Sequence, residues 1–169
     1  MGEPIDASLV LIKPDAIQKG LTGLVIRRLD EARLQMAGAK ISRVSRALAI
    51  EHYQALKEKP FFEDLIQHLC GTIHHVDHVL AFVYMGPGAI AKIRAISGAT
   101  HPEKADPMSL RGALGRMTAA GIMENVLHAS ATPEEAEREI KLWFHPEELL
   151  EPIYPTRPSK PAARLEWAA

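Results

Sequence analysis

An unbroken apolar run, residues 79–85 (VLAFVYM), restricts the possible fold more than any other feature of the sequence. Gly86, Pro87 and Gly88 end the run, and a bounded apolar run of this length is typical of a strand. It therefore predicts a strand in the middle of a sheet. At 169 residues, the chain fits one domain of ordinary size arranged around that strand.

The other elements are predicted from the spacing of apolar residues and from breakers. Further strands are expected at residues 8–13, 40–49 and 125–130. Helices are expected at residues 21–36, 51–57, 61–70 and 89–97, and in a last segment that begins at Thr132. Thr132 can cap that helix, Pro133 suits its first turn, and Glu135 can close a capping box. Residues 98–123 are rich in Gly, Pro, Ser and Thr and are expected to be irregular.

This order contains two successive β-α-β halves. It predicts an α+β fold of the ferredoxin-like type (βαββαβ), a four-stranded antiparallel sheet with helices on one face. A doubly wound parallel sheet is the alternative. Residues 1–151 are expected to form the domain. Residues 152–169 contain four prolines and are expected to be a Pro-rich extension, either loose or packed on the body or on a neighbouring subunit.

Composition narrows the classes of function. The formal net charge is −1, so no overall positive field exists to attract nucleic acid or an anionic membrane. An anionic ligand must therefore be held by a local cluster of donors. Cys70 is the only cysteine, which excludes an internal disulfide and suits the cytoplasm. No signal peptide is recognised at the start, and no stretch approaches the roughly 20 apolar residues of a membrane span.

Two groups of residues could bind phosphate. Lys13 closes the first predicted strand and can direct its ammonium group into a cleft, although a solvated lysine beside a turn fits the sequence equally well. Arg94 and Arg111 are separated by Thr100 and Ser109, and guanidinium forks with hydroxyl groups are suited to phosphate oxygens. Arginines of this kind are also common on any surface.

His128 is the candidate nucleophile. It lies on the last predicted strand, with Ser130 beside it and Glu139 on the next helix, close to the apolar stripe of that helix. A carboxylate or hydroxyl that holds one imidazole nitrogen leaves a lone pair on the other, as nucleophilic catalysis requires. A half-buried histidine bonded to its neighbours is the alternative for this residue taken alone.

A cluster of histidines, His74, His75 and His78 with Asp77, raises the possibility of a metal site. No cysteine lies among them, and their spacing matches no closed zinc site. A polar connecting loop explains them better, and a metal-binding module remains a minor alternative.

Six segments, in this order, give the chain a family resemblance: LVLIKPDAIQKGLTG, EHYQALKEKPFF, GATHP, SLRGALG, ENVLHAS and EEAEREIKLWFHPEEL. From about Ser8 to Leu150 the chain resembles the nucleoside diphosphate kinases. The resemblance implies the ferredoxin-like fold. It also implies transfer of the γ-phosphate of a nucleoside triphosphate, usually ATP, to a nucleoside diphosphate by a ping-pong mechanism through a phosphohistidine.

The resemblance also implies residue roles. The nucleophile falls on His128, and the residues that orient it fall on Ser130 and Glu139. The positions that bind phosphate or act in the transition state fall on Lys13, Tyr53, Arg94, Thr100 and Arg111. Asn125 matches the residue that contacts ribose and phosphates, Phe61 the aromatic that stacks on the base, and Leu65 its apolar neighbour.

The family further implies a cofactor and an assembly. Mg²⁺ bridges the phosphates and is not held in a protein cage. The partners are nucleoside di- and triphosphates, and a homo-oligomer is expected, a hexamer or a tetramer built from dimers. Neither a membrane nor a specific nucleic acid is an expected partner. A base that stacks on Phe61 and forms few hydrogen bonds through its edge is poorly distinguished from other bases, which predicts broad nucleotide specificity.

Several positions depart from the family pattern. The segment 70–79 and the stretch 112–124 are longer than usual, and Glu124 stands where an arginine is common. Ala129 and Ala131 replace a common glycine and a common aspartate. The alternative to an active kinase is a catalytically silent nucleotide-binding or regulatory module on the same fold.

Overall fold

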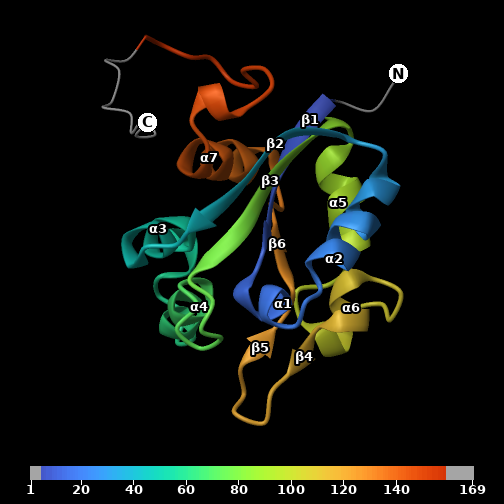
Figure 1. The fold of residues 1–169 in the computed structure, drawn as a ribbon, viewed down its shortest axis with the longest axis vertical. Coiled ribbons are helices and arrows are strands. Elements are labelled where there is room, and N and C mark those ends of the chain that lie inside the picture. The colour runs from blue at the N-terminus through green and yellow to red at the C-terminus, as the bar shows by residue number, and fades with distance from the viewer. Residues whose placement is uncertain (1–4, 159–169) are drawn as a thin grey trace, which may run out of the picture.

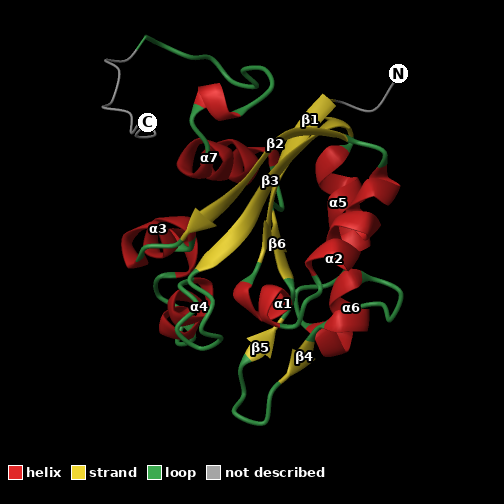
Figure 2. Ribbon diagram, viewed as in Figure 1, coloured by secondary structure: helices red, strands yellow, loops and turns green. Residues whose placement is uncertain are grey.

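The computed structural model describes residues 5–158, and its centre is a four-stranded antiparallel sheet (Figures 1 and 2). The strands are β1 (Ile5–Ile12), β2 (Gln35–Arg43), β3 (His78–Pro87) and β6 (Leu127–Ala129), in the spatial order β2-β3-β1-β6. Every neighbouring pair is antiparallel. The α+β ferredoxin-like prediction is therefore confirmed, and a doubly wound parallel sheet is excluded.

Helices pack on both faces of this sheet. The α-helices are α1 (Pro14–Gln18), α2 (Thr22–Leu29), α3 (Arg46–His52), α4 (Phe62–Leu69), α5 (Ala89–Ser97), α6 (Leu110–Leu114) and α7 (Pro133–Trp143). Four 3₁₀ turns, η1 (Asp30–Ala32), η2 (Gln54–Leu56), η3 (Pro102–Lys104) and η4 (Pro146–Glu148), and a small hairpin, β4 (Arg116–Met117) and β5 (Met123–Glu124), complete the fold.

The expectation that helices cover one face was wrong. Leu9 and Leu11 of β1 point into a core formed with α3, α4 and α7, whereas Val10 and Ile12 point into a second core formed with α1, α2, α5 and α6. Figure 2 shows these two groups of helices on opposite sides of the strands. Because all four side chains are fully buried, the strand needs cover on both faces, and this explains its continuous apolar sequence.

Two sequence boundaries between residues 21 and 49 were also wrong. The helix expected at 21–36 ends at Leu29, and Arg33 turns the chain with a left-handed φ of 52°. Met36 has helical spacing but lies in β2, where a bulge between Met36 and Gly38 disrupts the alternation that marks a strand. The expected strand 40–49 ends at Arg43.

The chain after β2 forms α3, because the Ser45 side chain accepts a hydrogen bond from the backbone N–H of Leu48 and caps the helix. Thr132 caps α7 in the same way, as predicted, by accepting from Glu135 N. The carboxylate of Glu135 bonds Ala131 N, one residue before the position that a capping box requires. The predicted helix 89–97 is confirmed as α5.

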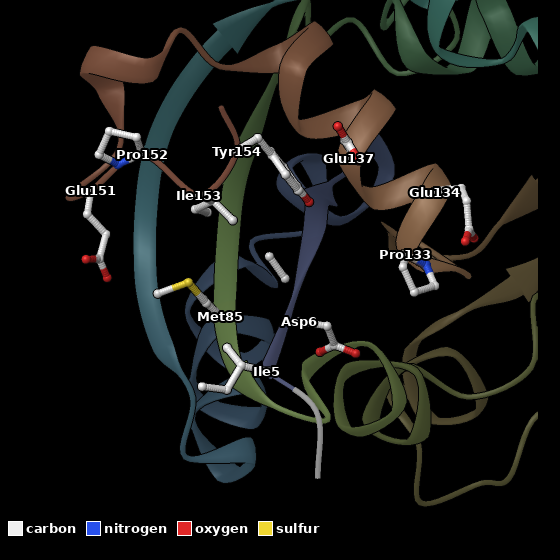
Figure 3. Close-up of a pocket in the computed structure, with 11 residues that line it drawn as sticks. Ile5, Asp6, Met85, Pro133, Glu134, Glu137, Glu151, Pro152, Ile153 and Tyr154 are labelled. Atoms are coloured by element: carbon white, nitrogen blue, oxygen red, sulfur yellow. The ribbon is translucent and has the colours of Figure 1, made fainter. Parts of the chain in front are cut away.

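Residues 152–158 run along α7. Ile153 and Tyr154 pack against the core on that side, and Lys141 Nζ lies 5.2 Å from the ring centroid of Tyr154. A pocket of about 390 Å³ opens between this segment, α7 and the start of β1 (Figure 3). The rest of the expected extension, residues 159–169, lies outside the described residues, so the division at residue 151 stays a prediction. Among residues 5–158, none of the helices combines the length and the apolar composition of a membrane-spanning segment.

Candidate active site

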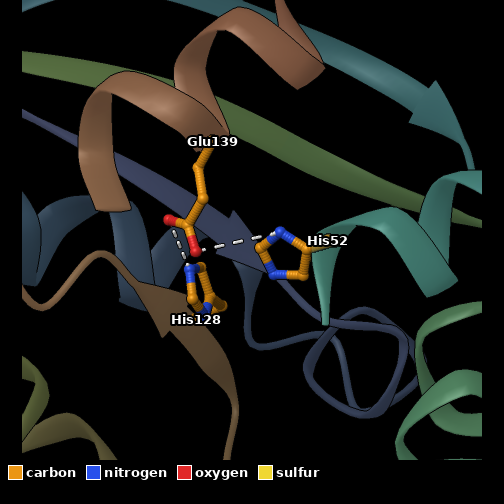
Figure 4. Close-up of side chains that lie close together, drawn as sticks. All are labelled: His52, His128 and Glu139. Carbon is orange, nitrogen blue, oxygen red and sulfur yellow. Dashed lines mark hydrogen bonds and ion pairs between the residues drawn. The ribbon is translucent and has the colours of Figure 1, made fainter. Parts of the chain in front are cut away.

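The imidazole of His128 is held by a carboxylate (Figure 4). His128 lies on β6, opposite Leu11 of β1, with 18% of its side chain exposed. Its Nε2 lies 2.9 Å from Oε2 of Glu139, and the Ser130 hydroxyl donates to the same oxygen at 2.7 Å. A neutral imidazole that donates from Nε2 has its lone pair on Nδ1. The pair therefore leaves Nδ1 available as a nucleophile.

Glu139 itself is fixed from several sides. It is buried on the inner face of α7, and Arg138 Nη2 lies 3.6 Å from its second oxygen. Burial raises the pKa of Glu139, but hydrogen bonds from His128 and Ser130 and the charge of Arg138 outweigh it, so the pKa lies below its ordinary value. The carboxylate is thus charged and can stabilise a positive imidazole during reaction.

His52 contacts the same group and was not predicted. Its ring packs edge-on against His128 with centroids 4.4 Å apart, and its Nδ1 accepts a hydrogen bond from Trp143 Nε1 at 3.2 Å. Burial and the charges of His128 and Lys13 hold the pKa of His52 well below 6.5. His52 is therefore a neutral, buried wall of the site. The only signal in the sequence for a place of His52 in the site was its position next to Tyr53, a predicted site residue.

Lys13 and Asn125 form the second part of the site. Lys13 follows β1, is almost completely buried and donates from Nζ to Asn125 Oδ1 at 2.8 Å. The amide of Asn125 donates in turn to the carbonyl of Thr100, whose side chain is exposed. Burial and the charge of Arg111, opposed by Asp15, lower the pKa of Lys13 to about 8.

Arg111 adds positive charge beside Leu127, the neighbour of His128, and Arg94 adds a second charge that acts on Arg111. Arg111 is buried and donates to the carbonyls of Gly98 and Leu127 at 2.8 and 3.0 Å, while its Nε has no partner among the described residues. Burial and the charge of Arg94 lower the pKa of Arg111 to about 10. Arg94 is exposed on α5. Such guanidinium groups are suited to phosphate oxygens.

The remaining predicted residues lie around this centre. Tyr53 is buried with its ring centroid 6.4 Å from that of His128, and burial raises the pKa of its hydroxyl above the ordinary value. Phe61 is 47% exposed where α4 begins, and Leu65, one turn later, is half-buried. No described contact joins Phe61 or Leu65 to His128. An exposed aromatic ring of this kind is available for stacking.

Within residues 5–158, one group of three histidine and carboxylate side chains is close enough to share a metal ion, namely His52, His128 and Glu139. In this group, Nδ1 of His52 bonds Trp143 and Nε2 of His128 bonds Glu139, whereas Nε2 of His52 has no partner among the described residues. The histidines singled out in the sequence separate: His74 is buried against Glu124, and His78 pairs with Asp77 at the surface. His74 lies in the connecting loop between α4 and β3, as predicted, and its side chain is buried.

Comparison with known proteins gives a consistent picture. The family model for nucleoside diphosphate kinase matches residues 6–149. A nucleoside diphosphate kinase of Symbiobacterium thermophilum is 46% identical over 140 residues, covering 83% of this chain and 87% of that protein. One from Thermus thermophilus is 42% identical over 146 residues, covering 86% of this chain and all of that protein.

Solved structures agree in fold. A transition-state mimic of the Borrelia burgdorferi nucleoside-diphosphate kinase with bound vanadate and ADP has a TM-score of 0.78 at 31% identity, covering 87% of this chain and 91% of that one. A halophilic nucleoside diphosphate kinase from Halobacterium salinarum in complex with CDP has a TM-score of 0.78 at 34% identity, covering 88% and 93%. This chain belongs to the nucleoside diphosphate kinase family.

Proposed function

We propose that this chain transfers the γ-phosphate of a nucleoside triphosphate, typically ATP, to a nucleoside diphosphate through a phosphohistidine at His128. The observation that carries the proposal is the hydrogen bond from Nε2 to Glu139, which leaves the lone pair of Nδ1 free. In the first half-reaction, Nδ1 attacks the γ-phosphorus and the bond to the β-phosphate oxygen breaks, releasing the diphosphate. In the second, a β-phosphate oxygen of another diphosphate attacks the phosphorus and the P–N bond breaks.

The surrounding side chains supply charge and position. Phosphoryl transfer spreads negative charge over the equatorial oxygens, so fixed positive donors stabilise the transition state. Lys13, Arg94 and Arg111 take this role, with Tyr53 and Thr100 as hydroxyl donors. Asn125 orients Lys13 and contacts the nucleotide. Glu139, aligned by Ser130, keeps the proton on Nε2 and balances the charge that develops on the imidazole.

Mg²⁺ is the proposed cofactor. It prefers six oxygen ligands, and the one candidate ligand group among residues 5–158 offers two imidazoles and a single carboxylate. This donor set fits an ion carried mainly by the nucleotide phosphates rather than by a protein cage. The ion would neutralise phosphate charge, while Lys13 and Arg111 bind the oxygens that remain.

The base is proposed to stack on Phe61 and to contact Leu65. Stacking needs only an aromatic face, so it tolerates purines and pyrimidines alike. The related structures from Borrelia burgdorferi and Halobacterium salinarum hold ADP and CDP respectively, and this supports a broad acceptance of bases. We expect comparable turnover numbers with ADP, GDP, CDP and UDP as phosphate acceptors at saturation. Strong selectivity among these four diphosphates would contradict this proposal.

The direct test is incubation of the wild-type protein with γ-labelled ATP and Mg²⁺ in the absence of an acceptor. We expect up to one label per chain, stable to base and labile to acid, that moves to any diphosphate added later. Proteolysis and mass spectrometry should locate it on the peptide that contains His128. Protein that binds nucleotide but takes no label would instead support a silent regulatory module.

Replacing Phe61 with alanine is expected to raise KM for nucleotides while leaving kcat nearly unchanged. Base–aromatic stacking contributes about 1–3 kcal/mol, so KM should rise roughly 5-fold to 150-fold. Leu24, which is also 47% exposed but lies on α2, provides the matched control as Leu24→Ala. An unchanged KM in Phe61→Ala, measured by steady-state kinetics, would contradict the stacking role.

The protein is further proposed to be a homo-oligomer, a hexamer or a tetramer built from dimers, and to act in the cytoplasm. Strand β2 is an edge of the sheet, and its Ile41 is 70% exposed, which leaves an apolar edge available to a second copy. The free thiol of Cys70 suits a reducing compartment. Light scattering of the purified protein tests the assembly.

A further inference from the structure

The turn formed by Asn125 and Val126 has an unfavourable backbone conformation, and it positions the Asn125 side chain that binds Lys13. Val126 has a φ of 71°, which a β-branched residue rarely adopts. Asn125 binds Lys13 and Thr100 through its side chain, and its carbonyl accepts from Leu127 N at 2.7 Å. Strained conformations of this kind persist only when their surroundings fix them. The supports of this turn therefore matter for the position of Lys13.

One support is a buried carboxylate from α1. Asp15 is completely buried, and its Oδ2 accepts the backbone N–H of Val126 at 2.9 Å. Its Oδ1 bonds Nε2 of His68, on α4, at 3.0 Å. Burial raises the pKa of Asp15, but His68, Lys13 and the Val126 N–H outweigh it and hold the pKa below its ordinary value. The carboxylate is thus charged and oriented.

The other support is Glu124, the residue directly before the turn. Glu124 is only 4% exposed, yet three donors converge on its carboxylate. Lys19 Nζ lies at 2.5 Å and Arg116 Nε at 2.6 Å from Oε2, and His74 Nε2 lies at 3.0 Å from Oε1. Burial raises the pKa of Glu124, but these donors lower it to about 2. The side chain is therefore an anionic anchor between α1, the β4–β5 hairpin and residue 74.

His74 joins this anchor to the first support. Its backbone carbonyl accepts from Gln18 Nε2 at 3.0 Å, and its ring lies 4.8 Å from the ring of His68. The side chain is 4% exposed. The segment between α4 and β3 is thus held by two contacts of His74, one from its backbone carbonyl to Gln18 and one from its side chain to Glu124. His68, which bonds Asp15, and His74, which bonds Glu124, thus lie side by side with their rings tilted by 41° and connect the two carboxylates.

We propose that Glu124 and His74 are positioning residues for phosphoryl transfer, and that they act by holding Asn125 where it orients Lys13. This inference rests on the proposed roles of Asn125 and Lys13. Neither Glu124 nor His74 contacts His128 or its partners, so any effect on turnover must pass through the turn. A purely structural role would instead lower stability without coupling to Asn125.

A double-mutant cycle between Glu124→Gln and Asn125→Ala tests the proposal. An amide at position 124 cannot accept from all three donors at once, so the turn should shift. Because small misplacements of binding groups reduce rates strongly, we expect Glu124→Gln to lower kcat/KM by about tenfold or more. In the Asn125→Ala background, the same substitution should cost almost nothing further, since the two residues act through one interaction.

Two further variants keep the test decisive if Glu124→Gln folds poorly. Arg116→Met removes one donor whose side chain is 62% exposed, and it should reduce kcat/KM without lowering the unfolding temperature appreciably. Glu148→Gln is the matched control, because it breaks an ion pair with Lys40 that lies outside the site. It should retain wild-type kcat/KM.

Two outcomes would overturn the inference. One is that the losses of Glu124→Gln and Asn125→Ala add in full. The other is that Glu124→Gln and Arg116→Met both retain wild-type kcat/KM. A wild-type protein without kinase activity would overturn the proposed function instead, so the two failures are distinguishable.

Discussion

Replacing His128 with alanine is expected to lower kcat/KM for phosphate transfer between nucleotides by at least about 10⁴-fold, because a covalent mechanism has no path without its nucleophile. Nucleotide binding should remain close to that of the wild type, since Lys13, Arg111 and Phe61 are unchanged. The variant should also take no acid-labile label from ATP. Coupled assays give the turnover, and equilibrium titration with a fluorescent nucleotide gives the binding.

His78→Ala is the control for this experiment. His78 lies on β3 and bonds Asp77 at the surface, with 35% of its side chain exposed. It should retain wild-type turnover and labelling. If His128→Ala kept turnover within tenfold of the wild type, the phosphate carrier would have to be another residue.

The second large effect concerns Lys13 and pH. The pKa of Lys13 is lowered from 10.5 to about 8, mainly by burial, so the free enzyme loses this charge as the pH rises through 8. Nucleotide phosphates are already fully ionised there. Since kcat/KM reports the free enzyme, we expect it to fall about tenfold per pH unit above pH 8. Lys13→Met should lose roughly 10²–10³-fold at pH 7, as removal of a single transition-state donor does.

The Lys13→Arg variant separates the effect of the positive charge at position 13 from the effect of the side-chain shape. A guanidinium stays protonated throughout this range, so the decline above pH 8 should vanish even if absolute turnover is reduced. Lys13 also affects stability in the same window. Its folded pKa is below its unfolded value, so its contribution is fully present above pH 10.5 and is lost as pH falls through 8. A flat wild-type profile from pH 7 to 10 would contradict the assignment.

The fold could be predicted wherever local signals agree. The apolar run at 79–85, the capped start at Thr132 and the helical spacing of 89–97 all specified elements that the structure contains. At β2 a strand was predicted but its bounds were wrong, because the bulge between Met36 and Gly38 disrupts the alternation at its start. Prediction also missed α6 and the β4–β5 hairpin, because elements of five and two residues are too short to show periodicity.

The site shows a different limit. The partnership of His128 with Glu139 could be proposed because the two are eleven residues apart on consecutive elements. The contacts of Asp15 with Val126 and of His74 with Glu124 join residues 111 and 50 positions apart, and no local pattern records them. Burial of His74 likewise depends on what folds over it, so its neighbours in sequence indicate a connecting loop but not a buried side chain.

The pairing of β1 with β6 has a consequence for synthesis. Leu9 N donates to the hydroxyl of Ser130 across 121 residues, so β1 gains its partner only after β6 has been synthesised. Glu139 arrives later still, on α7. A chain still emerging from a ribosome, at roughly 5–20 residues per second, therefore holds Lys13 for several seconds without the histidine and carboxylate it serves. Phosphate transfer therefore requires that β6 and α7 have folded against β1.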